Sequence, residues 1–484
     1  MSSINILSGK RLFIGLLLVI IALGLVVVTH QSITTSGEIT SDVNPVSDVN
    51  LIKEALAQIP ESVAKRHIKI QNWQSSLGIP VYFISTSEIA ALDIELNFNA
   101  GSARDDNKAG LANLTVELLD SGTVNKSSFD IARSLEQLGT QFSAFTNKDR
   151  TVISMRSLSD KEYLQPSIEL LTEIISQPTF QPVDFNRVRN QQVLNLQYQA
   201  EDAHYLTTNK AIQLLYPDHP YSSPIGGSEH SLKQLSEQDV RQFHKQYYVA
   251  RNLSIALTGN ITREQAEQIS EQISLSLPLG AAAGHLAQLK PGIAAVNVHI
   301  PLETEQVHIL LASQGIDRTS PDYPAMYVAN HILGGRGLSS ILMDQLREKQ
   351  GLVYGVYSLL VTHRYGGSFS ISTQTRAGQT AKTINEVQRL FKAFVKEGPT
   401  EKQLHDAIKM INGSYPMHST SNADLTVLLG DIGFFQLPVD ELDRFIASVN
   451  ALTREQIKDA MSRVIDLDKL IMITVGPEPD ASKL

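Results

Sequence analysis

Apolar and polar residues alternate over several short stretches of the chain, and this period of two predicts half-buried β-strands. Three such stretches are residues 81–84, 94–98 and 307–311. Elsewhere apolar residues recur every three or four positions, as in 168–175 and 384–391, which predicts amphipathic helices. Helices and short, antiparallel-looking strands interleave along the chain. The pattern therefore predicts an α+β fold in which helices pack on a mixed or antiparallel sheet.

The same pattern occurs twice. Leu-Ser-Glu-Gln-Asp-Val at 235–240 corresponds to Leu-Thr-Arg-Glu-Gln-Ile at 452–457, an offset of 217 positions. The strand end Ala-Leu-Thr-Gly at 256–259 corresponds to Ile-Thr-Val-Gly at 473–476 with the same offset. A third pair of predicted helix starts has an offset of 219 when Phe185 is set against Leu404. Repetition at a fixed distance indicates two copies of one domain of about 210 residues.

The duplication suggests where the domains begin and end. We expect an N-terminal domain at 61–278 and a C-terminal domain at 293–484. The segment 279–292 is rich in Gly, Ala and Pro, as is typical of a linker. Two further parts precede these domains: a membrane anchor with a short tip at 1–30, and a polar tether at 31–60.

The anchor is predicted from residues 12–29, an uncharged run of 18 residues that follows Lys10 and Arg11. A helix of this length approaches the thickness of a bilayer core. No Lys or Arg occurs in residues 12–52, so the positive-inside rule places the N-terminus in the cytoplasm. For a bacterial chain, this predicts a single-pass inner-membrane protein with a periplasmic body.

A cleaved signal peptide is the alternative interpretation of the same run. Its apolar core would be shorter, about 7 to 15 residues, and would end in small residues of the Ala-x-Ala kind. Val-Val-Val-Thr-His at 26–30 does not fit that pattern, so an uncleaved anchor is the prediction. The following residues are rich in Ser, Thr, Asp and Asn, which is typical of a flexible tether.

Composition excludes several kinds of site. The 484 residues carry a formal charge of −9, which argues against a nucleic-acid partner. The chain has no Cys, so thiolate zinc sites are impossible. Its 13 His include no two closer than His299 and His308, so no His-x-x-x-His pair exists.

The most informative motif is Gly-Leu-Ala-Asn-Leu-Thr-Val-Glu at 110–117, followed by Gly-Thr at 122–123. It resembles the signature of the pitrilysin/insulinase family of zinc peptidases, Gly-Leu-Ala-His-x-x-Glu-His and then Gly-Thr. Asn113, Val116 and Glu117 occupy the positions of the first His, the catalytic Glu and the second His. An amide is a poor zinc ligand, and Val116 has no atom that accepts a proton from water. The resemblance therefore implies a degenerate zinc site without catalysis of its own.

The family's third ligand, a Glu on a later helix, should fall at 191–197, where this chain has no acid. We therefore expect no metal or other cofactor in this chain. The face of Asn113 and Glu117 is interpreted as a polar patch lining a disused pocket, with residual metal binding as the alternative. Zinc is expected in a partner subunit instead.

The resemblance covers residues 67–477, and its most specific part in the second half is Leu-Arg-Glu-Lys-Gln-Gly-Leu-Val-Tyr at 346–354. In the family, an Arg and a Tyr seven apart at this place reach the substrate in the active site. Arg347 and Tyr354 match that spacing. Arg347 is expected in the last turn of a helix stopped by Gly351, and Tyr354 on the following strand with Leu352 and Val356.

A simpler interpretation needs no function: a cation favours a helix C-terminus, and a tyrosine packs well in a sheet. The chain also departs from the family at 340–342, where Ser-Ile-Leu replaces the frequent Ser-Arg-Leu. That departure removes one basic contact.

These features together resemble the non-catalytic subunit of a two-subunit peptidase such as the mitochondrial processing peptidase. The resemblance implies two domains facing each other like a clamshell, a homologous catalytic partner with an intact zinc motif, and peptide substrates. This chain would contribute Arg347 and Tyr354 to the partner's active site. The alternative is a non-enzymatic periplasmic peptide-binding or scaffold protein that keeps the peptidase-like shell.

Overall fold

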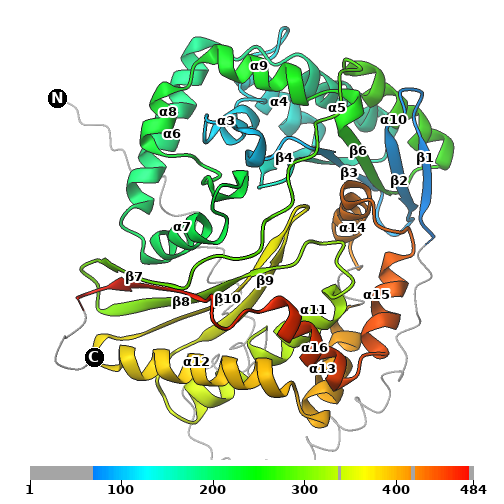
Figure 1. Cartoon of the computed structure of the whole chain (residues 1–484). Helices are drawn as coiled ribbons and strands as arrows, with labels where there is room; N and C mark the ends of the chain where they lie inside the picture. The colour runs from blue at the N-terminus through cyan, green and yellow to red at the C-terminus, as the bar shows by residue number, and fades with distance from the viewer. Residues whose placement is uncertain (1–68, 336–338, 416–419, 479–484) are drawn as a thin grey trace, which may run out of the picture. The chain divides into compact units, whose positions relative to one another are not determined.

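The computed structural model describes residues 69–335, 339–415 and 420–478 (Figure 1). The predicted anchor at 1–30 and the tether at 31–60 lie outside these residues. Across the part of the chain that is described, no helix is both long and apolar enough to cross a membrane.

The first half of the described chain contains a six-stranded sheet in the order β1-β2-β6-β3-β5-β4. Its strands are β1 Gln71–Gln74, β2 Pro80–Ser85, β3 Ala91–Phe98, β4 Gln141–Thr146, β5 Thr151–Leu158 and β6 Leu253–Gly259. Only β2 and β6 run parallel, and every other neighbouring pair is antiparallel. The predicted strands at 81–84 and 94–98 lie within β2 and β3, so both are confirmed.

The second half contains a five-stranded sheet in the order β7-β11-β8-β10-β9. Its strands are β7 Val296–Pro301, β8 Gln306–Gly315, β9 Val356–Thr362, β10 Gly367–Arg376 and β11 Ile471–Gly476. Again one pair, β7 and β11, is parallel, and the others are antiparallel. Apart from β1, the second sheet repeats the strand order and pairing directions of the first. The molecule is thus an α+β protein with two domains built on one plan.

Helices pack against both sheets (Figure 1). In the first half they are α3 Leu111–Glu117, α4 Ser128–Leu138, α5 Lys161–Ser176, α6 Pro182–Gln199, α7 Ala203–Leu215, α8 Glu229–Gln234, α9 Glu237–Tyr247 and α10 Arg263–Ser276. In the second half they are α11 Tyr323–Leu333, the π-helix η4 Met343–Glu348, α12 Thr380–Glu397, α13 Glu401–Ser414, α14 Asn422–Phe435, α15 Glu441–Asn450 and α16 Arg454–Val464. Short 3₁₀ turns occur at η1 Ser102–Arg104, η2 Pro220–Ser222, η3 Ala250–Asn252 and η5 Ala377–Gln379.

The predicted helical stripes belong to α5 and α12. In α5 the stripe is completely buried, with Ile168, Ile174 and Ile175 at 0% exposure. In α12, Val387 and Phe391 are buried in the second core. The repeated Leu-Ser/Thr motif marks the start of a helix in both halves. Ser236 and Thr453 are the N-caps of α9 and α16, each within a capping box.

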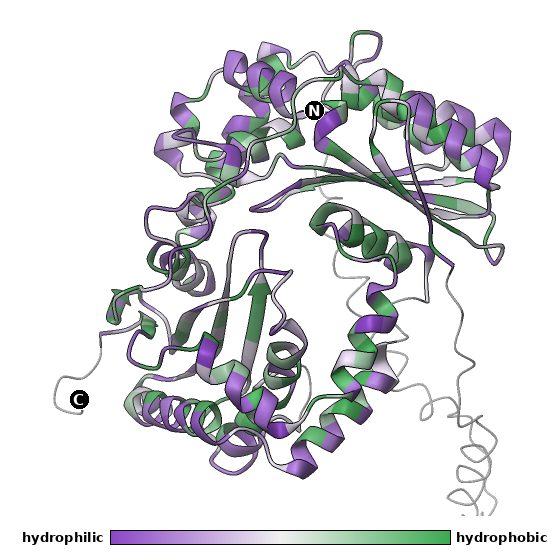
Figure 2. Ribbon diagram, turned by 45° about the vertical axis from the view of Figure 1, so that its right-hand side comes forward, coloured by the Kyte–Doolittle hydropathy of each residue, from purple (hydrophilic) through white to green (hydrophobic). Residues whose placement is uncertain are grey.

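The two halves exchange helices. Helix α14 of the second half packs on β6, β3 and β2 of the first sheet, while α7 of the first half packs on β11 and β8 of the second. Figure 2 colours α14 as hydrophobic along most of its length, as expected for a helix buried against a sheet. Gly430 permits its close approach, because a Cβ there would lie 2.0 Å from the Glu95 carboxylate.

No helix or strand is assigned between α10 and β7, in 277–295, which includes the predicted linker. The domain limits 61–278, 279–292 and 293–484 themselves stay a prediction.

Candidate functional site

Helix α3 carries the degenerate zinc motif, and a buried aspartate holds its N-terminus. The carboxylate of Asp105 accepts hydrogen bonds from the backbone N–H groups of Gly110 and Ala112, both at 2.8 Å. Gly110 has a left-handed φ of 95°, which suits glycine. Burial raises the pKa of Asp105 to about 7 and lowers the pKa of the neighbouring Lys148 to about 8. The helix start is therefore held by a buried carboxyl group of the first half.

The three motif positions have different environments. Asn113 is half-buried and donates from Nδ2 to Oε1 of Glu117 at 2.9 Å, so the two side chains bind each other across one helical turn. Val116 is 2% exposed and belongs to the first core. This face of α3 offers an amide and one carboxylate where a peptidase needs two imidazoles and a general base.

Helix α6 contacts α3 and carries the region where the family's third ligand is expected. A cavity of about 360 Å³ lies between these elements, and Asn113, Glu117, Gln192 and Asn195 all line it. The structure thus brings the degenerate motif together with residues 191–197. Five amide side chains line the cavity together with the Glu117 carboxylate and the buried Lys148: those of Asn113, Gln192, Asn195, Gln199 and Asn209.

Gln192 is the unusual member of this group. It is 4% exposed, yet both its amide atoms lack a hydrogen-bond partner. A buried amide without partners costs free energy, so it points to an occupant with both donors and acceptors. No group of three or more His, Asp or Glu suited to a metal ion occurs in residues 69–335, 339–415 or 420–478.

The local structure around Arg347 is as predicted. Arg347 lies in the last turn of η4, and Gly351 ends the helical segment with a left-handed φ of 59°. The N–H of Gly351 donates to Arg347 O at 3.0 Å, and the N–H of Leu352 donates to Leu346 O at 2.9 Å. These two bonds satisfy carbonyls at the helix end, as in a Schellman-type termination.

The predicted strand position of Tyr354 is wrong. Strand β9 begins only at Val356, and Tyr354 lies in a bend before it. Leu352 and Val356 are buried, whereas Tyr354 is 81% exposed, so the three do not share a face. The pairing of β9 with β10 ends at Val356 opposite Thr373. The Thr373 hydroxyl donates to the Gly355 carbonyl at 2.7 Å, so a side chain satisfies this carbonyl outside the strand ladder.

Arg347 and Tyr354 nevertheless lie together. The Arg347 guanidinium is 5.3 Å from the centroid of the Tyr354 ring, within the range of a cation–π contact. The side chain of Arg347 is 35% exposed and forms an ion pair with Glu348 at 3.4 Å. Neither Arg347 nor Tyr354 lines the cavity of Asn113 and Glu117.

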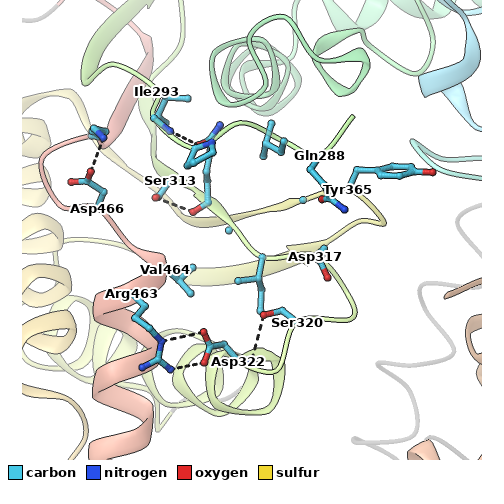
Figure 3. A pocket seen from close by; sticks show the side chains of 18 residues that line it. Gln288, Ile293, Ser313, Asp317, Ser320, Asp322, Tyr365, Arg463, Val464 and Asp466 are labelled. Carbon is cyan, nitrogen blue, oxygen red and sulfur yellow. Dashed lines mark hydrogen bonds and ion pairs between the residues drawn. The ribbon is translucent and has the colours of Figure 1, made fainter. Parts of the chain in front are cut away.

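A larger cavity of about 440 Å³ lies between the interdomain segment, β8 and α16 (Figure 3). Four of its charged side chains form two ion pairs: Arg463 pairs with Asp322 at 2.6 Å, and Lys469 pairs with Asp466 at 3.0 Å. The fifth, Asp317, accepts hydrogen bonds from the N–H and hydroxyl of Thr319. The amide of Gln314 donates to backbone carbonyls of Leu215 and Lys290. The polar side chains that line this cavity therefore serve contacts within the protein.

Sequence reasoning missed the contacts that join the two halves. Asp149 is 6% exposed and accepts from the Tyr221 hydroxyl and from the backbone N–H of Arg364. The next residue, Arg150, forms an ion pair with Asp431 of α14. No local signal reveals these partners, because each pair is separated by more than 70 positions.

Comparison with known proteins agrees with this geometry. The family model described as insulinase, peptidase family M16, matches residues 81–228, and the peptidase M16 inactive domain matches residues 234–411. A crystal structure of a peptidase M16 inactive domain from Pseudomonas fluorescens has a TM-score of 0.82 and 36% sequence identity, and the alignment covers 85% of this chain and 99% of that one. The chain belongs to the insulinase family, M16.

Two curated relatives are more distant in sequence. "Uncharacterized zinc protease YmxG" of Bacillus subtilis is 22% identical over 84% of this chain and 98% of its own length. "Non-peptidase homolog YmxG" of Helicobacter pylori is 23% identical over 82% of this chain and 92% of its own length. The structure of a protease from H. pylori, at 15% identity and a TM-score of 0.76, shows the same fold.

This M16 chain is therefore peptidase-like in fold, and one of the two family models that it matches describes an inactive domain. Asn113, Val116 and Glu117 stand in the motif, and no acid stands at 191–197. Its fold keeps the family's two-domain architecture.

Proposed function

We propose that this chain is the non-catalytic subunit of a two-subunit zinc metallopeptidase. It lends Arg347 and Tyr354 to the active site of a homologous partner that carries zinc and the water-activating Glu. The observation that carries the proposal is the 81% exposure of Tyr354 beside a half-exposed Arg347. Leu352 and Val356 on either side of it are buried, so Tyr354 contributes little to the packing of this segment.

The chemistry of this pair suits the role. A guanidinium and a phenol both donate hydrogen bonds, and a peptide carbonyl gains negative charge as water attacks it. The hydrogen-bonded turn at Gly351 and the ring contact with Arg347 bring the two donors together without a substrate. Donors fixed in advance cost no reorganisation when the charge develops.

Peptide substrates can be held by strand addition. In the described chain β4 is an edge strand of the first sheet and β9 an edge strand of the second, so each has a neighbour on one side only. Unpaired backbone groups on such an edge bind an extended peptide. Beside β4 a cavity of about 570 Å³ is lined by Phe142, Ser143, Glu117 and Gln191. A peptide added to β4 would run past the degenerate motif, so only the partner's zinc would cut it.

The anchor predicted at 1–30 completes the proposal: it places the complex at the periplasmic face of a bacterial inner membrane, with the body on the tether at 31–60. A membrane-held chamber closed by two subunits would admit short or unfolded peptides and exclude folded proteins.

Reconstitution tests the proposal. The full chain and the product of a neighbouring gene with an intact His-x-x-Glu-His would be purified separately and together, then assayed for peptide cleavage and zinc content. We expect cleavage only by the pair, with zinc in the partner alone. Equal cleavage by the partner alone would contradict the proposal.

A second candidate is a peptide-binding protein without any enzymatic partner. It is favoured by the cavity at Asn113, where Gln192 and Asn195 offer amide donors and acceptors, and where Gln192 has no partner within the described chain. Amides of this kind match the backbone of a bound peptide. Tight peptide binding by the chain alone, unchanged by loss of Arg347 and Tyr354, would support this candidate over the first.

A further inference from the structure

A fourth cavity lies where the two halves meet, apart from the degenerate motif. Its volume is about 250 Å³. The first half contributes the ends of β2, β3 and β6 with η3, and the second contributes the β9–β10 hairpin and the end of α14. The interdomain segment at 282–285 closes one side. The residues that matter for its chemistry are Asn97, Ser254, Arg251, His285 and Arg364.

The rim of this cavity is cationic. Arg251 and His285 are exposed, Arg364 is half-buried, and no Asp or Glu is among the lining residues. Within the described residues neither guanidinium forms an ion pair; that of Arg364 lies 5.3 Å from the Phe434 ring centroid. Two arginines without an ion pair in one cavity indicate an anionic ligand, since the chain as a whole has a formal charge of −9.

The floor of the cavity has unsatisfied hydrogen-bonding groups. Asn97 is 1% exposed and Ser254 is 6% exposed, and they sit directly opposite each other on β3 and β6. The Nδ2 of Asn97 donates to Glu95 at 2.9 Å, which leaves its Oδ1 as an acceptor without a donor. The hydroxyl of Ser254 is also without a partner. Buried groups of this kind are nearly always satisfied by something.

We propose that this cavity binds a carboxylate whose neighbouring atom carries an N–H donor: an amino acid or the C-terminal end of a short peptide. The arginines match a carboxylate, because guanidinium and carboxylate form short, charge-assisted hydrogen bonds. Asn97 Oδ1 can only accept, so the ligand must offer a donor towards the floor. A water molecule alone would satisfy Asn97 and Ser254 but leave both arginines without an anion.

The two arginines lie in different halves of the chain. Arg251 belongs to the first half and Arg364 to the second, so one carboxylate held by both links the halves. A ligand that binds only the folded, joined form raises the stability of the whole chain. The inference does not depend on a catalytic partner and can fail or hold separately from the proposed function.

Calorimetric titration of the full-length chain tests the site with five probes: glycine, glycylglycine, N-acetylglycine, glycinamide and inorganic phosphate. We expect binding of glycylglycine and N-acetylglycine together with a raised Tm. Glycinamide lacks the carboxylate and phosphate lacks the N–H, so both should bind at least tenfold more weakly. Binding of N-acetylglycine without binding of glycine would identify a peptide end as the ligand. Binding of glycine as tight as that of N-acetylglycine would show that a free amino acid is sufficient.

Variants separate this site from weak binding elsewhere. Arg251→Gln and Arg364→Gln should each weaken glycylglycine binding about tenfold or more, as expected for loss of a charge-assisted hydrogen bond. Ser254→Ala should weaken it less. Arg389→Gln is the matched control, because that arginine pairs with Glu386 on α12 outside the cavity. No detectable glycylglycine binding, phosphate binding as tight as glycylglycine binding, or unchanged affinity in both arginine variants would overturn the proposal.

Discussion

The guanidinium of Arg347 lies 5.3 Å from the ring centroid of Tyr354, and this tyrosine is 81% exposed. The contact joins the end of a π-helix to the bend before β9 across the turn at Gly351. An exposed aromatic ring held by a cation stabilises the fold little. The pair is therefore suited to contact a substrate or a partner subunit.

Arg347→Ala and Tyr354→Phe should lower kcat/KM of the reconstituted peptidase by roughly 100- to 1000-fold each, the usual cost of losing one preorganised donor. Assembly and zinc content should not change, because neither side chain is buried. Tyr357→Phe is the matched control, since Tyr357 is 52% exposed on β9 only three residues away. Steady-state assays with a quenched peptide are the measurement. A change below about threefold in both variants would make the pair structural, given that a catalytic donor costs far more.

The isolated chain should bind no stoichiometric zinc, because Asn113, Val116 and Glu117 supply no ligand pair. Asn113→His, Val116→Glu and Glu117→His together should bind zinc only weakly. Adding Gln192→Glu should tighten binding, since Gln192 lines the same cavity as Asn113. Atomic absorption after dialysis measures this. One zinc per wild-type chain, or no gain from Gln192→Glu, would contradict the prediction.

The ion pair between Arg150 and Asp431 should stabilise the contact between the first sheet and α14. Arg150 is 12% exposed and its guanidinium also lies 5.1 Å from the Phe434 ring. Arg150→Ala should lower the free energy of unfolding by about 2 to 3 kcal/mol, less than for a fully buried pair because Asp431 is 36% exposed. Urea denaturation measures the loss. Arg133→Ala breaks an exposed pair with Asp130 and should cost less than about 1 kcal/mol.

Acid should destabilise the first domain through His244. Burial lowers the pKa of this imidazole from 6.5 to about 4, and its Nε2 donates to the Ile175 carbonyl at 2.8 Å. The unfolded chain takes up a proton near pH 6.5 while the folded chain stays neutral, so stability present above pH 6.5 is lost as the pH falls to 4. The loss should be about 3 kcal/mol. His244→Gln keeps a donor without titrating, so the slope of unfolding free energy against pH should flatten over this window. An unchanged slope would exclude His244 as its source.

The N-terminal prediction has its own test. The mature protein should keep Met1 or Ser2 and resist carbonate extraction from membranes, and deletion of residues 1–30 should leave a soluble, folded body. Intact-mass spectrometry and fractionation check both points. A soluble natural form beginning near residue 30 would support the cleaved signal peptide instead.

Local patterns in the sequence determined much of this protein. Alternation predicted β2, β3 and β8, and helical periodicity predicted α5 and α12, because each depends on which face of one element is buried. The repeated Leu-Ser/Thr motif predicted the duplication, since the same capping box begins α9 and α16. The degenerate zinc motif was predicted from the residue types at Asn113, Val116 and Glu117 alone, because a zinc ligand must be Cys, His, Asp or Glu.

Only the tertiary structure decided which distant residues meet. It placed Gln192 in the cavity of Asn113, paired Arg150 with Asp431, and exchanged α7 and α14 between the sheets. It also exposed Tyr354, although alternation predicted a strand shared with Leu352 and Val356. The physical reason is common to all four: burial and pairing depend on what the rest of the chain places opposite a residue, and that partner leaves no mark on the neighbouring sequence.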